Sequence, residues 1–139
     1  TEDLKKQARQ YTDKVIFTGR LTDLELKAYL LACDIFCFPS ITKNEAFGLA
    51  LAEAMYFEKP AITFTIPGSG VNYVSLSGVT GIEVPNADSK AYSEAISLLA
   101  HDKELRYKYG EAAKNRVEKI FMKANFKINV ETLLNSVSD

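Results

Sequence analysis

Residues 39–55 read Pro39-Ser40-Ile41-Thr42-Lys43-Asn44-Glu45-Ala46-Phe47-Gly48-Leu49-Ala50-Leu51-Ala52-Glu53-Ala54-Met55. The apolar run Asp34-Ile35-Phe36-Cys37-Phe38 precedes this stretch and predicts a strand that ends at Pro39. The helical spacing of Leu49, Leu51 and Met55 predicts a helix from about Phe47 to near Pro60. A strand, a polar loop over 40–45 and a helix form the unit of a parallel α/β sheet. The loop should then lie at the carboxyl edge of that sheet, where doubly wound folds bind ligands.

The rest of the chain repeats this alternation of short β-type runs and longer helical patterns. Apolar runs predict further strands at 15–18, 61–64 and 81–85. Helices are expected at 4–11, 22–32, 71–76, from 88 or 89 to about 99, from 102 to about 120, and from 125 to about 136. Thr22 and Glu25 form a capping box for the second of these, which should bury Leu26, Tyr29 and Leu30. The predicted fold class is therefore α/β: a Rossmann-like parallel sheet with helices on both faces and a helical tail from about residue 88.

The predicted helix start near Phe47 suits a phosphate. Its free backbone N–H groups and the positive end of the helix dipole both favour an anion. Gly48 carries no side chain, so a ligand can approach the backbone closely. Glu53 lies about 1.5 turns further on, and its carboxylate could accept hydrogen bonds from both hydroxyls of a ribose. The plainer alternatives are that Glu53 is an ordinary exposed helix residue and that Glu45 only complements the helix dipole.

Composition excludes several other classes. With 17 basic and 18 acidic residues the net charge is −1, which gives no argument for nucleic acid or an anionic membrane. Cys33, Cys37 and the single histidine, His101, are a poor zinc set, so we expect two reduced, buried thiols of a cytosolic protein and no metal site. His101 is expected at a helix C-terminus. The glycine-rich signatures of ATPases and dehydrogenases do not occur, and no apolar run is long enough to span a bilayer.

A family resemblance rests on Pro39-Ser40, Glu45-x-Phe47-Gly48-Leu49, Glu53-Ala54-Met55 and Lys59-Pro60. These motifs resemble the retaining GT-B glycosyltransferases of the group 1, or family 4, type, which include mannosyl-, glucosyl- and rhamnosyltransferases of cell-surface polysaccharide synthesis. Glu45 and Glu53 match the Glu-x7-Glu motif of that family. Further similarity at 15–19, 78–85, 101–106 and 116–117 extends the resemblance over about residues 4–126.

The resemblance implies a role for each matching position. Glu45 would contact the donor sugar near the reacting anomeric carbon, as the catalytic residue. The backbone amides of Phe47, Gly48, Leu49 and Ala50 would hold the sugar and diphosphate, and Glu53 would hold the ribose. Arg20 and Leu21 would lie beside the base, although a solvated Arg20 is an equally good interpretation. The loop Pro67-Gly68-Ser69-Gly70 would face the cleft or be a plain flexible turn.

The same resemblance implies what the whole protein does. Residues 1–139 would be a partial C-terminal nucleotide-sugar-binding domain. The donor would be a UDP-sugar or GDP-sugar, with no separate cofactor, and a hydroxyl acceptor on a glycan or lipid-linked sugar would be bound mainly by an N-terminal domain. The location would be cytoplasmic, which leaves open the inner face of the membrane and peripheral membrane association of the full enzyme. Two alternatives stay open: a nucleotide-sugar-binding module without catalysis, or another doubly wound enzyme such as a GT-B-like sugar epimerase or a nucleotide hydrolase.

The resemblance also implies missing parts. The family places a basic Arg and Lys pair for the donor diphosphate on the first strand–loop–helix unit of this domain, and nothing before Val15 matches that unit. The start at Thr1 is polar and has no initiator Met, so we expect an excised piece that is inactive by itself. In the strand order 3-2-1-4-5-6, residues 15–18 would form the third strand and 35–38 the fourth. We expect the two central strands to belong to a part of the protein outside this sequence. If these residues were instead the whole chain, unpaired strand edges would favour rearrangement or swapping into a homodimer of the fragment.

Overall fold

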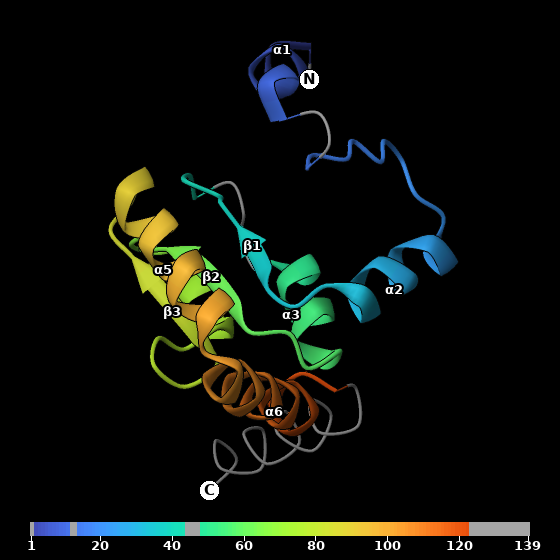
Figure 1. Cartoon of the computed structure of the whole chain (residues 1–139). Coiled ribbons are helices and arrows are strands. Elements are labelled where there is room, and N and C mark those ends of the chain that lie inside the picture. The colour runs from blue at the N-terminus through green and yellow to red at the C-terminus, as the bar shows by residue number, and fades with distance from the viewer. Residues whose placement is uncertain (1, 12–13, 44–47, 123–139) are drawn as a thin grey trace, which may run out of the picture.

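The computed structural model describes residues 2–11, 14–43 and 48–122, and it has the α/β architecture that the sequence predicts (Figure 1). Strands and helices alternate from β1 onward. In chain order the elements are α1 (Glu2–Ala8), the 3₁₀ helix η1 (Arg9–Tyr11), α2 (Asp23–Ala32), β1 (Phe36–Phe38), α3 (Leu49–Tyr56), β2 (Ala61–Phe64), α4 (Val71–Val74), β3 (Gly81–Val84), α5 (Ser89–His101) and α6 (Lys103–Ile120). The predicted last helix over 125–136 lies outside the described residues.

The described strands form one parallel sheet in the order β1-β2-β3. Phe36 pairs with Ala61, and Ala61 pairs in turn with Gly81. Side chains alternate between the two faces of a strand, so Ala61 and Ile62 belong to different cores. One core lies under α3, α4 and α6 and contains Leu51, Met55, Ala61, Val71, Val74, Ala113 and Val117. The other lies under α5 and contains Ile62, Phe64, Ile66, Val84, Tyr92, Ala95 and Leu99. Helices therefore cover both faces, as predicted.

The helix starts follow the predicted caps. Thr22 Oγ1 accepts from the Glu25 amide at 3.3 Å, and the Glu25 carboxylate accepts from the Thr22 amide at 2.8 Å, which completes the capping box. Asp88 and Asp102 accept from the third residues of α5 and α6 in the same way. His101 is the last residue of α5, and its Nδ1 lies 2.8 Å from the carbonyl oxygen of Ser97. These local predictions are confirmed because each depends on a few neighbouring residues.

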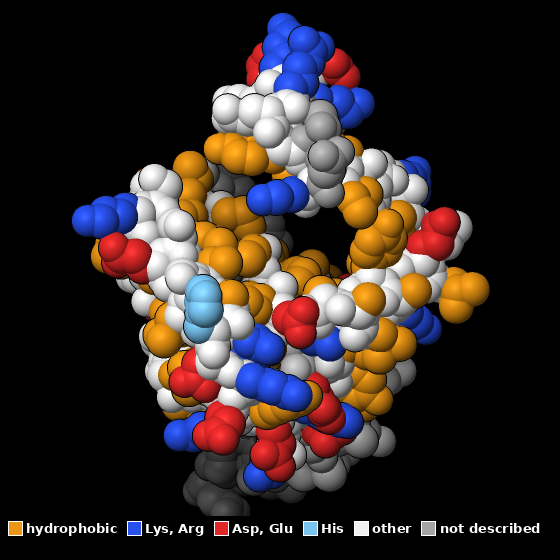
Figure 2. Space-filling model, in the orientation of Figure 1, with side chains coloured by type: hydrophobic (Ala, Val, Ile, Leu, Met, Phe, Trp, Pro, Cys, Tyr) orange, Lys and Arg blue, Asp and Glu red, His pale blue; other side chains and the backbone are white. Residues whose placement is uncertain are grey.

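The predicted strand at Val15–Thr18 is wrong. These residues have no regular secondary structure and pair with no described strand, and Ile16 is 77% exposed. A strand needs a partner for its backbone N–H and C=O groups, and Figure 1 shows α1 and the segment that follows it standing clear of the sheet. Figure 2 shows hydrophobic side chains around the hollow that separates this segment from the rest of the molecule.

The predicted burial of α2 is confirmed only in part. Leu30 is 5% exposed, whereas Leu26 and Tyr29 are 39% and 47% exposed. The prediction of two reduced, buried thiols is also confirmed only in part. Both thiols are free, but Cys33 is half-buried and Cys37, on β1, is exposed. In both places the reason is that β1 is the outermost of the described strands, so its neighbours have cover on one side only.

Helix α6 approaches the chain between α3 and β2 unusually closely. A Cβ atom added at Gly110 would lie 2.2 Å from the carbonyl oxygen of Glu58, so only glycine fits there without movement. Glu58 itself has a left-handed backbone with φ 60°. Its carboxylate pairs with Lys114 Nζ at 2.9 Å. The backbone approach at Gly110 and this ion pair together fix the position of α6 against the core that contains Ala113 and Val117.

Candidate functional site

Three loops meet at the carboxyl edge of the parallel sheet. They follow β1 (residues 39–48), β2 (65–70) and β3 (85–88), since parallel strands end on the same side. Asn86 Nδ2 donates to the carbonyl oxygen of Ile41 at 3.2 Å and so joins the first and third loops. The side chain of Lys43 lies against Gly68 and joins the first and second. The described part of the first loop is thus held from two sides at the edge where doubly wound domains bind ligands.

Helix α3 starts without a side-chain cap. Its N-cap residue is Gly48, with φ 74° and ψ 57°, and no side chain among the described residues caps the first turn. An L side chain at Gly48 would be strained by this left-handed backbone and would stand 3.4 Å from Leu51 Cβ. Leu49 and Ala50 are exposed. Within the described residues, no side chain occupies the N–H groups of Leu49 and Ala50, and Gly48 is buried. Binding of an anion at this helix start stays a prediction.

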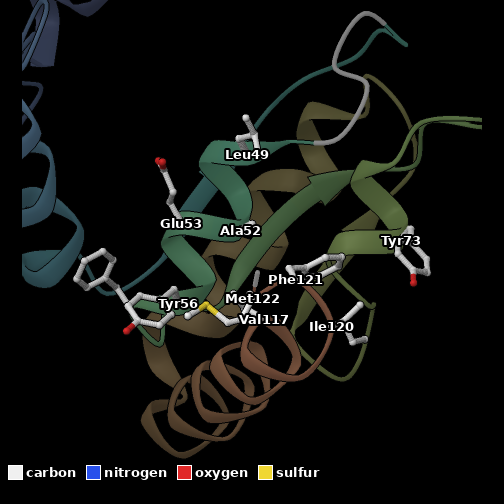
Figure 3. Close-up of a pocket in the computed structure, with 10 residues that line it drawn as sticks. Leu49, Ala52, Glu53, Tyr56, Tyr73, Val117, Ile120, Phe121 and Met122 are labelled. Carbon is white, nitrogen blue, oxygen red and sulfur yellow. The ribbon is translucent and has the colours of Figure 1, made fainter. Parts of the chain in front are cut away.

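Glu53 lies one turn further along α3 and is exposed. Figure 3 shows its carboxylate pointing away from the helix into open space. A small cavity of about 270 Å³ lies beside it, between α2 and α3, and its lining includes Leu26, Leu30 and Phe57. Among the described residues the Glu53 carboxylate has no hydrogen-bond partner, whereas its backbone carbonyl oxygen accepts from the Phe57 amide at 3.3 Å. The exposure agrees with the plainer alternative for Glu53, and it also leaves both carboxylate oxygens free for a ligand.

Of the other predicted site residues, two are described, and they lie on the segment before α2. Glu45 and Phe47 lie outside the described residues. Arg20 is exposed and Leu21 is half-buried, on the segment before α2 that stands clear of the sheet in Figure 1. Their contact with a base stays a prediction. The structure thus brings together Gly48, Leu49, Ala50 and Glu53, all on one helix start.

An apolar groove that the sequence analysis did not identify runs along the outer side of α3. Its volume is about 670 Å³, and Figure 3 shows its walls rising from α3, α4 and the end of α6. The lining is Leu49, Ala52, Glu53, Tyr56, Phe57, Tyr73, Val117, Ile120, Phe121 and Met122. Glu53 is the one charged residue among these, so the groove offers nothing to a diphosphate. The spacing of Leu49, Ala52 and Tyr56, three and four residues apart, places them on one helix face and could have predicted this groove from the sequence.

Arg116 stabilises the wall of this groove that α4 and the end of α6 form. Its Nε donates to the carbonyl oxygen of Val74 at 3.0 Å, and a second guanidinium nitrogen donates to the carbonyl oxygen of Tyr73. The guanidinium carbon lies 5.2 Å from the centre of the Tyr73 ring and 5.8 Å from that of Phe121. These contacts tie the end of α4 to α6 and stabilise the fold rather than a ligand.

The parallel sheet, with an uncapped helix start at its carboxyl edge, defines the class of Rossmann-like ligand-binding domains. Within that class, the model of one family, described as glycosyl transferases group 1, matches residues 1–116. The chain belongs to this family. It is 33% identical over 120 residues to the O-antigen chain mannosyltransferase C of Escherichia coli, covering 86% of this chain and 32% of that protein. It is 33% identical over 107 residues to the D-rhamnosyltransferase WbpZ of Pseudomonas aeruginosa, covering 77% and 28%.

Solved structures give the same fold. Sucrose-phosphate synthase from Thermosynechococcus elongatus superposes with a TM-score of 0.82 at 24% identity, over 98% of this chain and 34% of that one. Anabaena Alr3699/HepE, in complex with UDP and glucose, superposes with a TM-score of 0.78 at 21% identity, over 95% and 35%. The fold is that of a GT-B glycosyltransferase domain. The chain spans about a third of the length of the relatives it matches.

The described helices differ from those that span membranes. Over residues 2–11, 14–43 and 48–122, none has both the length and the apolar character needed to cross a bilayer.

Proposed function

We propose that this chain forms the nucleotide-sugar-binding part of a glycosyltransferase, which transfers a sugar from a UDP-sugar or GDP-sugar to a hydroxyl acceptor with retention of configuration. The observation that carries the proposal is the uncapped start of α3 at the carboxyl edge of the sheet, in a chain that belongs to the glycosyl transferases group 1 family. HepE, a structural neighbour, has been solved with UDP and glucose. The names of the two bacterial relatives support a role in O-antigen or other cell-surface polysaccharide synthesis.

In the proposed reaction, the main task of the protein is to stabilise the charge on the leaving group. The bond between the anomeric carbon and the diphosphate oxygen breaks, a bond to the acceptor oxygen forms, and the proton of the acceptor hydroxyl passes to the departing diphosphate. Negative charge grows on the departing diphosphate and must be compensated. The backbone amides of Gly48, Leu49 and Ala50, together with that of Phe47, would donate to the diphosphate and sugar, with support from the α3 dipole.

Two carboxylates have separate proposed roles. Glu53 would accept hydrogen bonds from the two ribose hydroxyls, which its exposed position on the second turn of α3 leaves room for. Glu45 would hold the donor sugar hydroxyls near the anomeric carbon, where orientation lowers the barrier to transfer. Arg20 and Leu21 would lie beside the base through their backbone.

The rest of the proposal concerns the whole protein. The acceptor, a glycan or lipid-linked sugar, would be bound mainly by residues outside this chain, and the basic pair for the diphosphate would come from the same source. We therefore propose that this chain alone binds the donor without transferring its sugar. The full enzyme would act in the cytoplasm, at the inner face of the membrane where a lipid-linked acceptor would be found.

Calorimetric titration with UDP and GDP tests the proposal. The wild-type chain is compared with Glu53→Ala and with the matched control Glu111→Ala, which removes an exposed carboxylate from α6. Loss of two charge-assisted hydrogen bonds should weaken binding roughly tenfold or more in Glu53→Ala and leave the control unchanged. A folded chain that binds neither nucleotide, together with a longer form of the protein that also fails to bind, would contradict the proposal. Equal affinities of the two variants would remove Glu53 from the site.

A further inference from the structure

The side chain of Lys43 reaches from the loop after β1 across to the loop after β2. Its Nζ and Cε lie 3.6 Å and 3.7 Å from the position that a Cβ atom would have on Gly68. Gly68 has φ +79°, so its turn presents bare backbone, and the lysine stem lies against it. Lys43 therefore holds its ammonium group at the carboxyl edge of the sheet rather than extending it away from the site.

The turn on which Lys43 rests is itself firmly held. The Ser69 amide donates to the carbonyl oxygen of Ile66 at 3.0 Å. Asn72 Oδ1 accepts from the Ile66 amide at 2.8 Å, and Asn72 Nδ2 donates to the carbonyl oxygen of Phe64 at 3.0 Å. One side chain thus fixes both the end of β2 and the loop that follows it. A support fixed in this way lowers the entropy that Lys43 loses when it binds a ligand.

The loop after β2 lies beside both Lys43 and the start of α3. A Cβ atom on Gly48 would lie 3.6 Å from Cγ2 of Val71, and Val71 is three residues beyond Gly68. Three residues span about 10 Å at most. The two loops therefore run alongside each other, with Lys43 over one end of the segment 68–71 and the uncapped helix start over the other.

The ammonium group of Lys43 is uncommitted within the described part of the chain. It forms no ion pair or hydrogen bond there. Two acidic side chains near this edge already have partners, since Glu83 accepts from Thr65 Oγ1 at 2.7 Å and Asp88 caps α5. Within the described residues, the edge therefore presents the positive charge of Lys43 near the first N–H groups of α3. That combination matches a ligand with concentrated negative charge.

We propose that Lys43 binds the diphosphate of the nucleotide-sugar donor, an inference that rests on the proposed function. Its ammonium group supplies positive charge from within this chain, on the opposite side of the diphosphate from the amides of Gly48 and Leu49. During transfer, the same contact stabilises the negative charge that grows on the leaving group. The competing interpretation is that Lys43 is a solvated loop residue that only packs on Gly68.

The test compares ligands with and without the diphosphate. The 139-residue chain is titrated with UDP, GDP, uridine and guanosine, as wild type, Lys43→Met, Lys43→Arg and the matched control Lys108→Met, an exposed lysine on α6. Lys43→Met should weaken UDP and GDP binding roughly tenfold, leave the nucleosides unchanged, and be largely rescued in Lys43→Arg. The Lys108→Met control should match the wild type for all four ligands. Circular dichroism checks that each variant is folded, and Lys43→Gln replaces Lys43→Met if the latter is not.

The outcomes separate this inference from the proposed function. A wild-type chain that binds UDP or GDP, with Lys43→Met equal to Lys108→Met, would overturn the role of Lys43 and leave the donor site standing. Equal weakening of nucleosides and nucleotides by Lys43→Met would also overturn it, because that pattern indicates a structural change. If the folded wild-type chain and a longer form of the protein both bind none of the four ligands, the donor site is contradicted and the role of Lys43 with it. If the longer form alone binds, the same variants are compared in that form, with the same expected results.

Discussion

Replacing Gly110 by Ala sets local helix preference against tertiary packing. In the middle of α6, Ala is intrinsically better than Gly by about 1 kcal/mol. The structure predicts the opposite sign, because the new Cβ would lie 2.2 Å from the carbonyl oxygen of Glu58. An ordinary carbon–oxygen contact is at least about 3.3 Å. Either α6 or the chain at Glu58 must therefore move by about 1 Å.

Such a movement disturbs the first core. Ala113 and Val117, one and two turns beyond Gly110, are 0% and 5% exposed and pack under α3. Overpacking of this kind costs about 1–3 kcal/mol, and sometimes more. After subtracting the gain in helix preference, we expect Gly110→Ala to lower the free energy of unfolding by up to about 2 kcal/mol. At a typical urea dependence of about 1–3 kcal/mol per M, the midpoint would fall by roughly 1 M.

Urea unfolding followed by circular dichroism measures this change. Asn115→Ala is the control, since it places the same residue on an exposed position of the same helix. It should be neutral or stabilise the protein by about 0.5 kcal/mol. A Gly110→Ala midpoint at or above that of the wild type would refute the reasoning, because it would mean that α6 does not approach Glu58 closely enough to exclude a methyl group.

Two further changes test buried and exposed polar contacts. Thr80→Val keeps the shape of a fully buried side chain but removes the Oγ1 that accepts from the Leu76 amide at 2.8 Å and contacts Ser75 Oγ at 3.1 Å. The unpaired groups should cost about 1–3 kcal/mol in urea unfolding, whereas Thr42→Val, at an exposed position, should cost nothing measurable. In the capping box, hydrogen bonds from Thr22 hold the pKa of Glu25 below its ordinary value near 4.5. A carboxyl group whose pKa is lowered on folding stabilises the folded form only while the carboxylate is charged. Protection of the Thr22 amide from hydrogen exchange should therefore be complete above pH 5 and decline as the pH falls through the folded pKa of Glu25. Unchanged protection at pH 2 would contradict this.

The predicted elements that depend on neighbouring residues are the ones that the structure confirms. The capping box at Thr22, the caps at Asp88 and Asp102, and the strands at 61–64 and 81–84 each depend on a few adjacent side chains. The helix start at Gly48 could be predicted as well, because a glycine between a polar loop and an apolar helical pattern is informative by itself.

The predictions that failed depend on distant partners. Val15–Thr18 has strand-forming side chains, but local preference cannot supply a strand to pair with. Burial of Leu26 and Tyr29 likewise needs a surface that faces them. The close contact at Gly110 was missed although the sequence held a signal, since a glycine inside an amphipathic helix often marks a close backbone approach. The predicted role of Glu45 came from the family motif, and that of Glu53 from its place on the helix as well as from the motif; both stay predictions. The position of Lys43 beside Gly68 became visible only in three dimensions.

The order β1-β2-β3 also has a consequence for how the domain assembles. Each strand pairs with the next one along the chain, and the paired residues Phe36 and Ala61 are 25 positions apart, as Ala61 and Gly81 are 20 apart. Closing loops of this length costs little entropy. Parallel sheets usually fold slowly because their contacts join distant parts of the chain, but here each pairing can form as soon as the next strand leaves the ribosome. The sheet can therefore grow in the direction of synthesis, with each new strand added beside the one made before it.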